Sequence, residues 1–129
     1  MVRLLRRSDK KAGIVSSGDK EFITTLLRNI SVDGVLISET FPAEALIADA
    51  AKPDTKLPLA CAKLLGYNIG SEDTSPFIVY LGDDLPDIES VPYDGSVQGV
   101  MIGEKAISFN ADHNHQHILY INSLKEIFA

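Results

Sequence analysis

The feature that most restricts the fold of this chain is the alternation of short apolar runs with segments of helical spacing over residues 12–82. Apolar runs predict strands at 12–16, 33–38 and 76–81. Apolar spacing, capping residues and good helix formers predict helices at 19–30, 42–51 and 55–65. Strands that alternate with helices favour parallel β-α-β units with the helices packed on a sheet. The run at 76–81 lacks polar alternation, which is typical of a central strand covered on both faces.

The last third of the chain has a different pattern. Residues 97–102, 105–109 and 116–122 predict short strands, and Gly103 with Glu104 suits a tight hairpin between the first two. Residues 82–95 predict a long acidic loop. We therefore expect one α/β domain over residues 1–129, with a mixed, mainly parallel twisted sheet, flanking helices and a C-terminal antiparallel β-meander. Its parts are a basic arm or first strand (1–11), a βαβ-type region (12–82) and the meander (97–122).

Length and cysteine content narrow the class of protein. A chain of 129 residues with 45% apolar residues is about one globular domain. Its single cysteine, Cys61, excludes an internal disulfide and suits a reducing compartment, so we expect a cytoplasmic protein. Cys61 lies in an apolar helical stretch, which predicts a buried, unreactive thiol. The sequence predicts neither a signal peptide nor a membrane span.

Charge is distributed unevenly along the chain. The formal net charge is −6, and the residues after position 11 comprise seven basic and seventeen acidic side chains. A body this acidic repels nucleic-acid phosphates, which argues against a broad nucleic-acid surface. The acidic loop is either simply solvated or a docking surface for a basic protein partner. The last predicted strand is a candidate edge, so a homodimer through that edge is a further expectation.

Polar residues follow each predicted strand of the first part. In open α/β sheets, ligands bind beyond the carboxyl ends of the strands. Hydroxyls before a helix suit a phosphate, and paired aspartates suit Mg²⁺. Strand ends and turns are also rich in these residue types for structural reasons, so that interpretation stays open. The candidate ligand-binding residues are Ser16, Ser17, Gly18, Ser38, Thr40, Asp83 and Asp84.

All three histidines of the chain lie in one short segment, at His113, His115 and His117. Alternate residues of an extended strand face the same side, so this pattern can present three imidazoles together. Three imidazoles suit a transition metal such as Zn²⁺, Cu²⁺ or Ni²⁺. The alternative is a polar, exposed turn without a metal.

Residues 33–42 resemble the third-strand segment of response-regulator receiver domains, with Pro42 in the place of that family's proline. Residues 14–17 resemble the family's first strand, and residues 76–82 its fourth. Ser38 stands where the family has its phosphorylated aspartate, and Ser16 with Ser17 replaces its Mg²⁺-binding acidic pair. The resemblance covers about half the chain. It implies a flavodoxin-like, receiver-like module that is not phosphorylated in the usual way.

The first hypothesis for function is a non-catalytic regulatory domain that binds a protein partner. It rests on the lack of a complete Ser/His/Asp, Cys/His or paired-carboxylate set at a suitable spacing, so no catalytic residue is assigned and no cofactor is expected. The alternative is a small protein that binds a phosphate ligand or nucleotide, or an Mg²⁺-dependent enzyme, using the strand ends. A weaker alternative is a metal-binding protein that uses the histidine segment.

Overall fold

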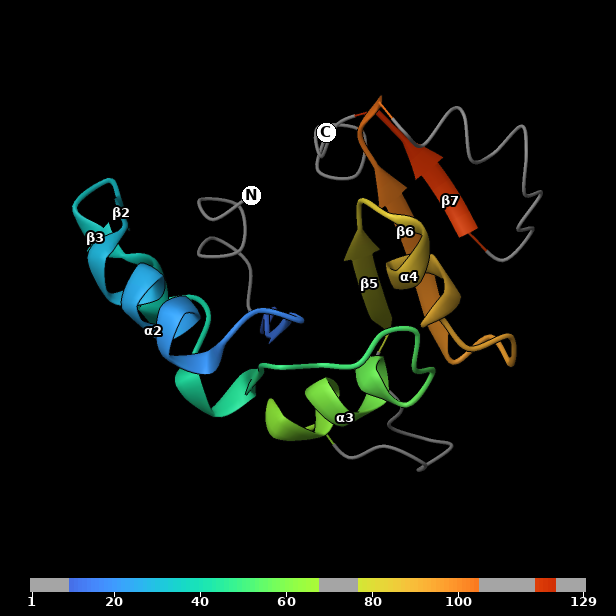
Figure 1. The fold of residues 1–129 in the computed structure, drawn as a ribbon, viewed down its shortest axis with the longest axis horizontal. Coiled ribbons are helices and arrows are strands. Elements are labelled where there is room, and N and C mark those ends of the chain that lie inside the picture. Colours follow the sequence, from blue (N-terminus) through green and yellow to red (C-terminus); the bar gives the residue numbers. More distant parts are fainter. Residues whose placement is uncertain (1–9, 68–76, 105–117, 123–129) are drawn as a thin grey trace.

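The computed structural model describes residues 10–67, 77–104 and 118–122, and they form a mixed α/β structure of small, mainly parallel sheets with helices (Figure 1). One parallel pair joins β1 (Ile14–Val15) to β4 (Leu46–Ile47). An antiparallel pair joins β2 (Ser31–Val32) to β3 (Val35–Leu36). The third sheet has the order β5 (Ile78–Gly82), β6 (Val97–Ile102) and β7 (Ile118–Ile121).

Three α-helices and two short 3₁₀-helices connect these strands. The α-helices are α2 (Lys20–Asn29), α3 (Leu57–Leu64) and α4 (Leu85–Glu89), and the 3₁₀-helices are η1 (Ile37–Glu39) and η2 (Ala43–Ala45). In Figure 1, α2 and the β2–β3 hairpin lie on one side of the molecule, and the β5–β6–β7 sheet lies on the other. No helix within the described residues is long and apolar enough to span a membrane.

The predicted helix at 19–30 is confirmed as α2. Asp19 is its N-cap, and one carboxylate oxygen of Asp19 accepts a hydrogen bond from the Phe22 amide at 3.1 Å. Only Leu27 is buried on this helix. The apolar side chains of this helix therefore extend over a wider face than the one that the fold buries.

The segment at 33–38 is not a strand of a parallel sheet. Asp33 and Gly34 have φ angles of 55° and 76°, and they form the two-residue loop between β2 and β3. A two-residue loop with both φ angles positive is a type I′ hairpin turn, for which Asp-Gly is a preferred sequence. This local signal predicts the antiparallel hairpin that the structure contains.

The predicted helix at 42–51 is wrong. After Pro42 the chain makes the single 3₁₀-turn η2 and then becomes β4, which pairs with β1. Ala45 is almost fully buried at this point. Good helix formers thus lie in a strand because pairing with β1 and burial outweigh a weak intrinsic preference.

The C-terminal antiparallel meander is also wrong, because β6 pairs with both β5 and β7 in parallel. A parallel pair needs a crossover connection, and α4 supplies it between β5 and β6. The predicted acidic loop at 82–95 therefore contains a helix. Within the described residues β6 is the central strand, and β5 is at an edge. The strand predicted at 105–109 lies outside the described residues.

The core lies between this parallel sheet and α4. Its buried side chains are Ile88, Val91, Val97, Met101 and Ile118. Gly99 of β6 allows the close packing, because a Cβ atom there would contact Ile118 and lie 2.7 Å from Val91 Cγ2. The predicted helix at 55–65 is confirmed as α3 and ends before Gly66, whose φ is 90°. Leu59 of α3 packs against the core from its side.

Candidate functional site

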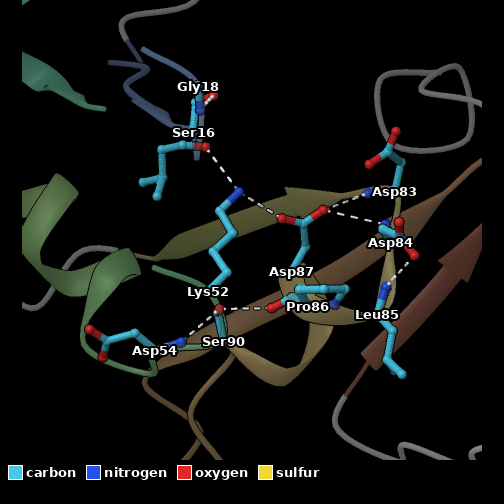
Figure 2. A network of polar contacts seen from close by, with 11 residues as sticks. Ser16, Gly18, Lys52, Asp54, Asp83, Asp84, Leu85, Pro86, Asp87 and Ser90 are labelled. Carbon is cyan, nitrogen blue, oxygen red and sulfur yellow. Dashed lines mark hydrogen bonds and ion pairs between the residues drawn. The ribbon is translucent and has the colours of Figure 1, made fainter. Parts of the chain in front are cut away.

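The carboxyl ends of β1 and β5 are joined by one lysine. The Lys52 ammonium donates to the Val15 carbonyl at 3.2 Å and to Asp87 Oδ1 at 2.7 Å (Figure 2). Val15 is the last residue of β1, and Asp87 lies in the first turn of α4, directly after β5. Lys52 itself follows β4 by five residues. Residues at or just beyond the carboxyl ends of three strands therefore meet around this side chain.

Backbone hydrogen bonds bring Lys52 to this position. The Ala50 amide donates to the Ser16 carbonyl, and the Asp49 amide donates to the Gly18 carbonyl, both at 2.9 Å. The chain segments that follow β1 and β4 therefore stay paired beyond the strands. Asp49 has a φ of 52°, so the backbone turns here before it reaches Lys52.

A buried serine anchors the other side of the lysine. Ser90 is fully buried, and its hydroxyl accepts from the Asp54 amide at 3.0 Å and donates to the Pro86 carbonyl at 2.8 Å (Figure 2). The segment after Lys52 is thus attached to α4. The segment before Lys52 is bonded to the end of β1 and the segment after it to α4, which limits the movement of the Lys52 backbone.

Asp87 organises the turn after β5. Its second carboxylate oxygen accepts from the amides of Asp83 and Asp84, both at 3.3 Å. The Asp84 carboxylate accepts from the Leu85 amide at 2.9 Å. Asp84 and Asp87 also form a capping box at the start of α4, in which the side chain of each accepts from the backbone amide of the other. Gly82 is required for this approach, since a Cβ atom there would lie 2.8 Å from Asp87 Cγ. Asp83 and Asp84 themselves are exposed.

The ion pair between Lys52 and Asp87 is largely shielded from solvent, with 14% of each side chain exposed. Burial by itself lowers the pKa of Lys52, but the hydrogen bond and charge of Asp87, together with Tyr80, raise it above its usual value in net. Burial also raises the pKa of Tyr80. Lys52 therefore keeps its positive charge through the neutral range.

The raised Lys52 pKa predicts a loss of stability at alkaline pH. Because the folded state holds the proton more tightly, this contribution is complete below the unfolded-state pKa of about 10.4. It disappears as the pH rises through the higher folded-state pKa. We expect the free energy of unfolding, measured by urea titration above about pH 10, to fall less steeply in Lys52→Met than in the wild type. Equal slopes would contradict the assignment, and Tyr80→Phe separates the contribution of the tyrosine.

The structure brings together some of the residues that the sequence singled out. The Ser16 hydroxyl accepts from the Gly18 amide at 3.0 Å, and Ser17 is exposed in the same turn. This turn lies on the side of Lys52 opposite Asp83 and Asp84 (Figure 2). Lys52 thus lies between the serine turn and the aspartate turn.

Ser38 and Thr40 are placed elsewhere, because β3 runs in an antiparallel hairpin. Ser38 is in η1, and Thr40 lines a cavity of about 650 Å³. The other lining residues mostly precede β1 and β4, so this cavity is at the amino ends of those strands; they are Lys10, Lys11, Ala12, Glu39, Pro42, Glu44, Leu64 and Leu65. His113, His115 and His117 lie outside the described residues.

Sequence reasoning missed the two residues at the centre of this site. The helix predicted at 42–51 ends just before Lys52, and this wrong prediction hides that the lysine follows a strand. Asp87 falls within the long acidic loop predicted at 82–95. The sequence does contain a local signal for α4. Pro86 lies one residue inside the start of this helix, and Asp84 is its N-cap.

The described residues provide neither a cluster of metal ligands nor a reactive thiol. In the part of the chain that the structure describes, no three His, Cys, Asp or Glu side chains are grouped so that they could hold a metal ion. Cys61 is buried, its thiol donates to the Ala45 carbonyl at 3.6 Å, and burial raises its pKa. A thiol in this state is a poor nucleophile.

Comparison with known proteins adds no family to these observations. No protein-family model, no curated protein and no solved structure matches the chain significantly.

Proposed function

We propose that this chain binds a phosphate-bearing small molecule together with Mg²⁺ at the strand-end site around Lys52. The observation that carries the proposal is the position of the Lys52 ammonium, 3.2 Å from the last carbonyl of β1 and 2.7 Å from a carboxylate at the start of α4. A lysine held at the carboxyl edge of parallel strands provides a fixed positive charge where ligands of α/β folds usually bind.

The charge balance of the site favours a metal with the phosphate. Three aspartates, Asp83, Asp84 and Asp87, lie in or just after the turn that follows β5, and only Asp87 is paired with a lysine, so a free phosphate would be repelled. Mg²⁺ commonly binds through one or two carboxylates, several waters and the phosphate oxygens of the ligand. Asp83 and Asp84 are exposed and adjacent, so they suit such a partial ligand set. Such a site needs fewer protein ligands than a metal site built from protein side chains alone.

The phosphate would contact Lys52 and the hydroxyl of Ser16. Lysine binds phosphate as a point charge, and the Ser16 hydroxyl can still donate its proton because its oxygen serves as an acceptor for Gly18. The backbone amides at the start of α2 contribute less to phosphate binding than the sequence suggests, because the Asp19 carboxylate already accepts from one of them, the Phe22 amide. Asp19 would also repel an anion there.

The proposal predicts a ligand-induced rise in melting temperature that needs both components. Nucleotides and sugar phosphates with Mg²⁺ should stabilise the protein by about 2.7 kcal/mol at a hundred times the dissociation constant, which is roughly 10 °C for a domain of this size. Neither component alone should do so. Asp83→Asn and Ser16→Ala should each reduce the shift.

Glu89→Gln is the matched control, because Glu89 is an exposed acidic residue on α4 outside the proposed ligand set. This variant should keep the full thermal shift. An unchanged shift in Asp83→Asn, or no shift with any phosphate ligand and Mg²⁺, would contradict the proposal.

A receiver-like, non-catalytic domain that binds a protein partner is the second candidate. It is favoured by Phe77 and Tyr93, whose side chains are 83% and 76% exposed. Both line a cavity of about 210 Å³ together with Pro92 and Val97. Aromatic side chains are enriched in protein interfaces. Two results together would favour this second role: no phosphate titration shows binding, and Tyr93→Ala no longer binds a protein partner that the wild type binds.

A further inference from the structure

The cavity at the amino ends of β1 and β4 lies at the end of these strands opposite the strand-end site. Its volume is about 650 Å³, within the range of roughly 300–1,000 Å³ that is typical of small-molecule sites. Its lining comes from residues 10–12 before β1, from residues of the segment 39–44 before β4, and from the carboxyl end of α3. No residue of the strand-end site lines this cavity, so the two sites are separate.

Charged side chains of both signs line this cavity. Lys10 and Lys11 come from the segment before β1, whereas Glu39 lies in η1 and Glu44 in η2. All four residues are exposed. Among the described residues, no ion pair joins Lys11 to either glutamate. The charges of Lys11, Glu39 and Glu44 therefore do not neutralise one another by direct contact, and a ligand can reach them.

Two contacts hold the Lys11 ammonium beside the cavity. It donates to the Leu65 carbonyl at 3.1 Å, and it lies 5.4 Å from the centroid of the Tyr67 ring, within the range of a cation–π contact. Leu65 is the C-cap of α3, where a positive charge interacts favourably with the helix dipole. An ammonium group has three donors, so a position fixed by one of them leaves others that can bind a carboxylate.

Apolar side chains complete the lining and restrict the class of ligand. They are Ala12, Pro42, Leu64 and Leu65, and Leu64 is 48% exposed. A ligand that covers Leu64 gains from removing this apolar surface from water. A wholly apolar ligand would desolvate the charged side chains without replacing their contacts with water. A simple anion would be repelled by the two glutamates and a simple cation by the two lysines.

We propose that this cavity binds a small zwitterion with an aliphatic body, of the dipeptide class. The ligand carboxylate contacts the Lys11 ammonium, the ligand ammonium contacts Glu39 or Glu44, and the aliphatic side chains cover Leu64. Two lysines and two glutamates sum to no net charge, which matches a ligand that carries one charge of each sign. The volume of the cavity favours a dipeptide over a single amino acid. This site does not depend on the ligand proposed for the strand-end site.

Calorimetric titration of the full chain with leucyl-leucine tests this site. For an open cavity and a ligand of this size we expect a dissociation constant of roughly 0.1–1 mM. N-acetyl-leucyl-leucine lacks the positive charge of the dipeptide, and leucyl-leucine amide lacks its negative charge. Each modified form should bind about fivefold more weakly, because it loses one exposed ion pair. A modified form that binds as well as the dipeptide would overturn the proposal.

Variants of the chain locate the binding. Lys11→Gln, and the double variant Glu39→Gln with Glu44→Gln, should each weaken leucyl-leucine binding by about fivefold while circular dichroism stays that of the wild type. The matched control is Glu21→Gln with Glu89→Gln, which removes two exposed acidic charges outside the cavity and should keep the wild-type affinity.

Asp83→Asn separates this site from the strand-end site, because it should keep dipeptide binding while it reduces the thermal shift with phosphate ligands and Mg²⁺. The absence of leucyl-leucine binding to the wild type would overturn the proposal and leave the strand-end site untouched. Wild-type affinity in both cavity variants would likewise overturn it, since the dipeptide would then bind elsewhere.

Discussion

Replacing Met101 with alanine is expected to lower the free energy of unfolding by about 2–5 kcal/mol. Met101 is fully buried near the carboxyl end of β6, the central strand that pairs with both β5 and β7. Its truncation would leave a cavity between the sheet and α4, lined by side chains such as Ile88 and Val91. Since small domains have a total stability of about 5–15 kcal/mol, this is a large fraction of the total. Urea unfolding followed by circular dichroism measures the change.

Leu119→Ala is the matched control for this prediction. Leu119 lies on the adjacent strand β7, but 51% of its side chain is exposed. We expect its truncation to change stability by only about 0.5 kcal/mol. Similar losses in the two variants would mean that β6 is not the centre of the core.

The second large effect is expected at Lys52, and it has a structural and a functional part. Lys52→Met leaves the Asp87 carboxylate shielded without its cation, which should cost about 1.5–3 kcal/mol, the range for a hydrogen bond to a charged group. The same variant should abolish the thermal shift produced by phosphate ligands with Mg²⁺. Urea unfolding measures the structural part, and ligand titration of the folded variant measures the functional part.

A second variant separates the two parts. Lys52→Met combined with Asp87→Asn removes the unpaired charge, while the amide oxygen of asparagine can still accept from the Asp83 and Asp84 amides. We expect the double variant to be more stable than Lys52→Met alone, and a double-mutant cycle gives the coupling energy. Ligand binding should not return with stability. Recovered binding would mean that Lys52 supports only the fold.

Together these variants test whether the core and the strand-end site are separate features. The core is held by burial of apolar side chains in one sheet, and Met101 is its most buried large residue beside Ile88. The site is held by Lys52, which joins segments that follow three different strands. We expect Met101→Ala, studied below its melting temperature, to keep its ligand-induced thermal shift even though its stability is lower.

Some of this structure follows from local sequence alone. Helix α2 was predicted from its apolar spacing, and α3 from helix formers followed by Gly66. The strands within 76–81 and 97–102 were predicted from runs of apolar residues. These elements depend on hydrogen bonds, caps and steric preferences within a few residues, so nearby sequence is sufficient to specify them.

Only the tertiary structure decided the pairing of strands and the composition of the site. Residues 46–47 became β4 because β1 lies beside them, and β5 and β6 run parallel because α4 carries the chain back across the sheet. β7 then pairs in parallel with β6. Strand partners and directions depend on residues far apart in sequence, and apolar periodicity does not encode them. Lys52 and Asp87 are 35 residues apart in the sequence, so only the folded structure shows that they form an ion pair.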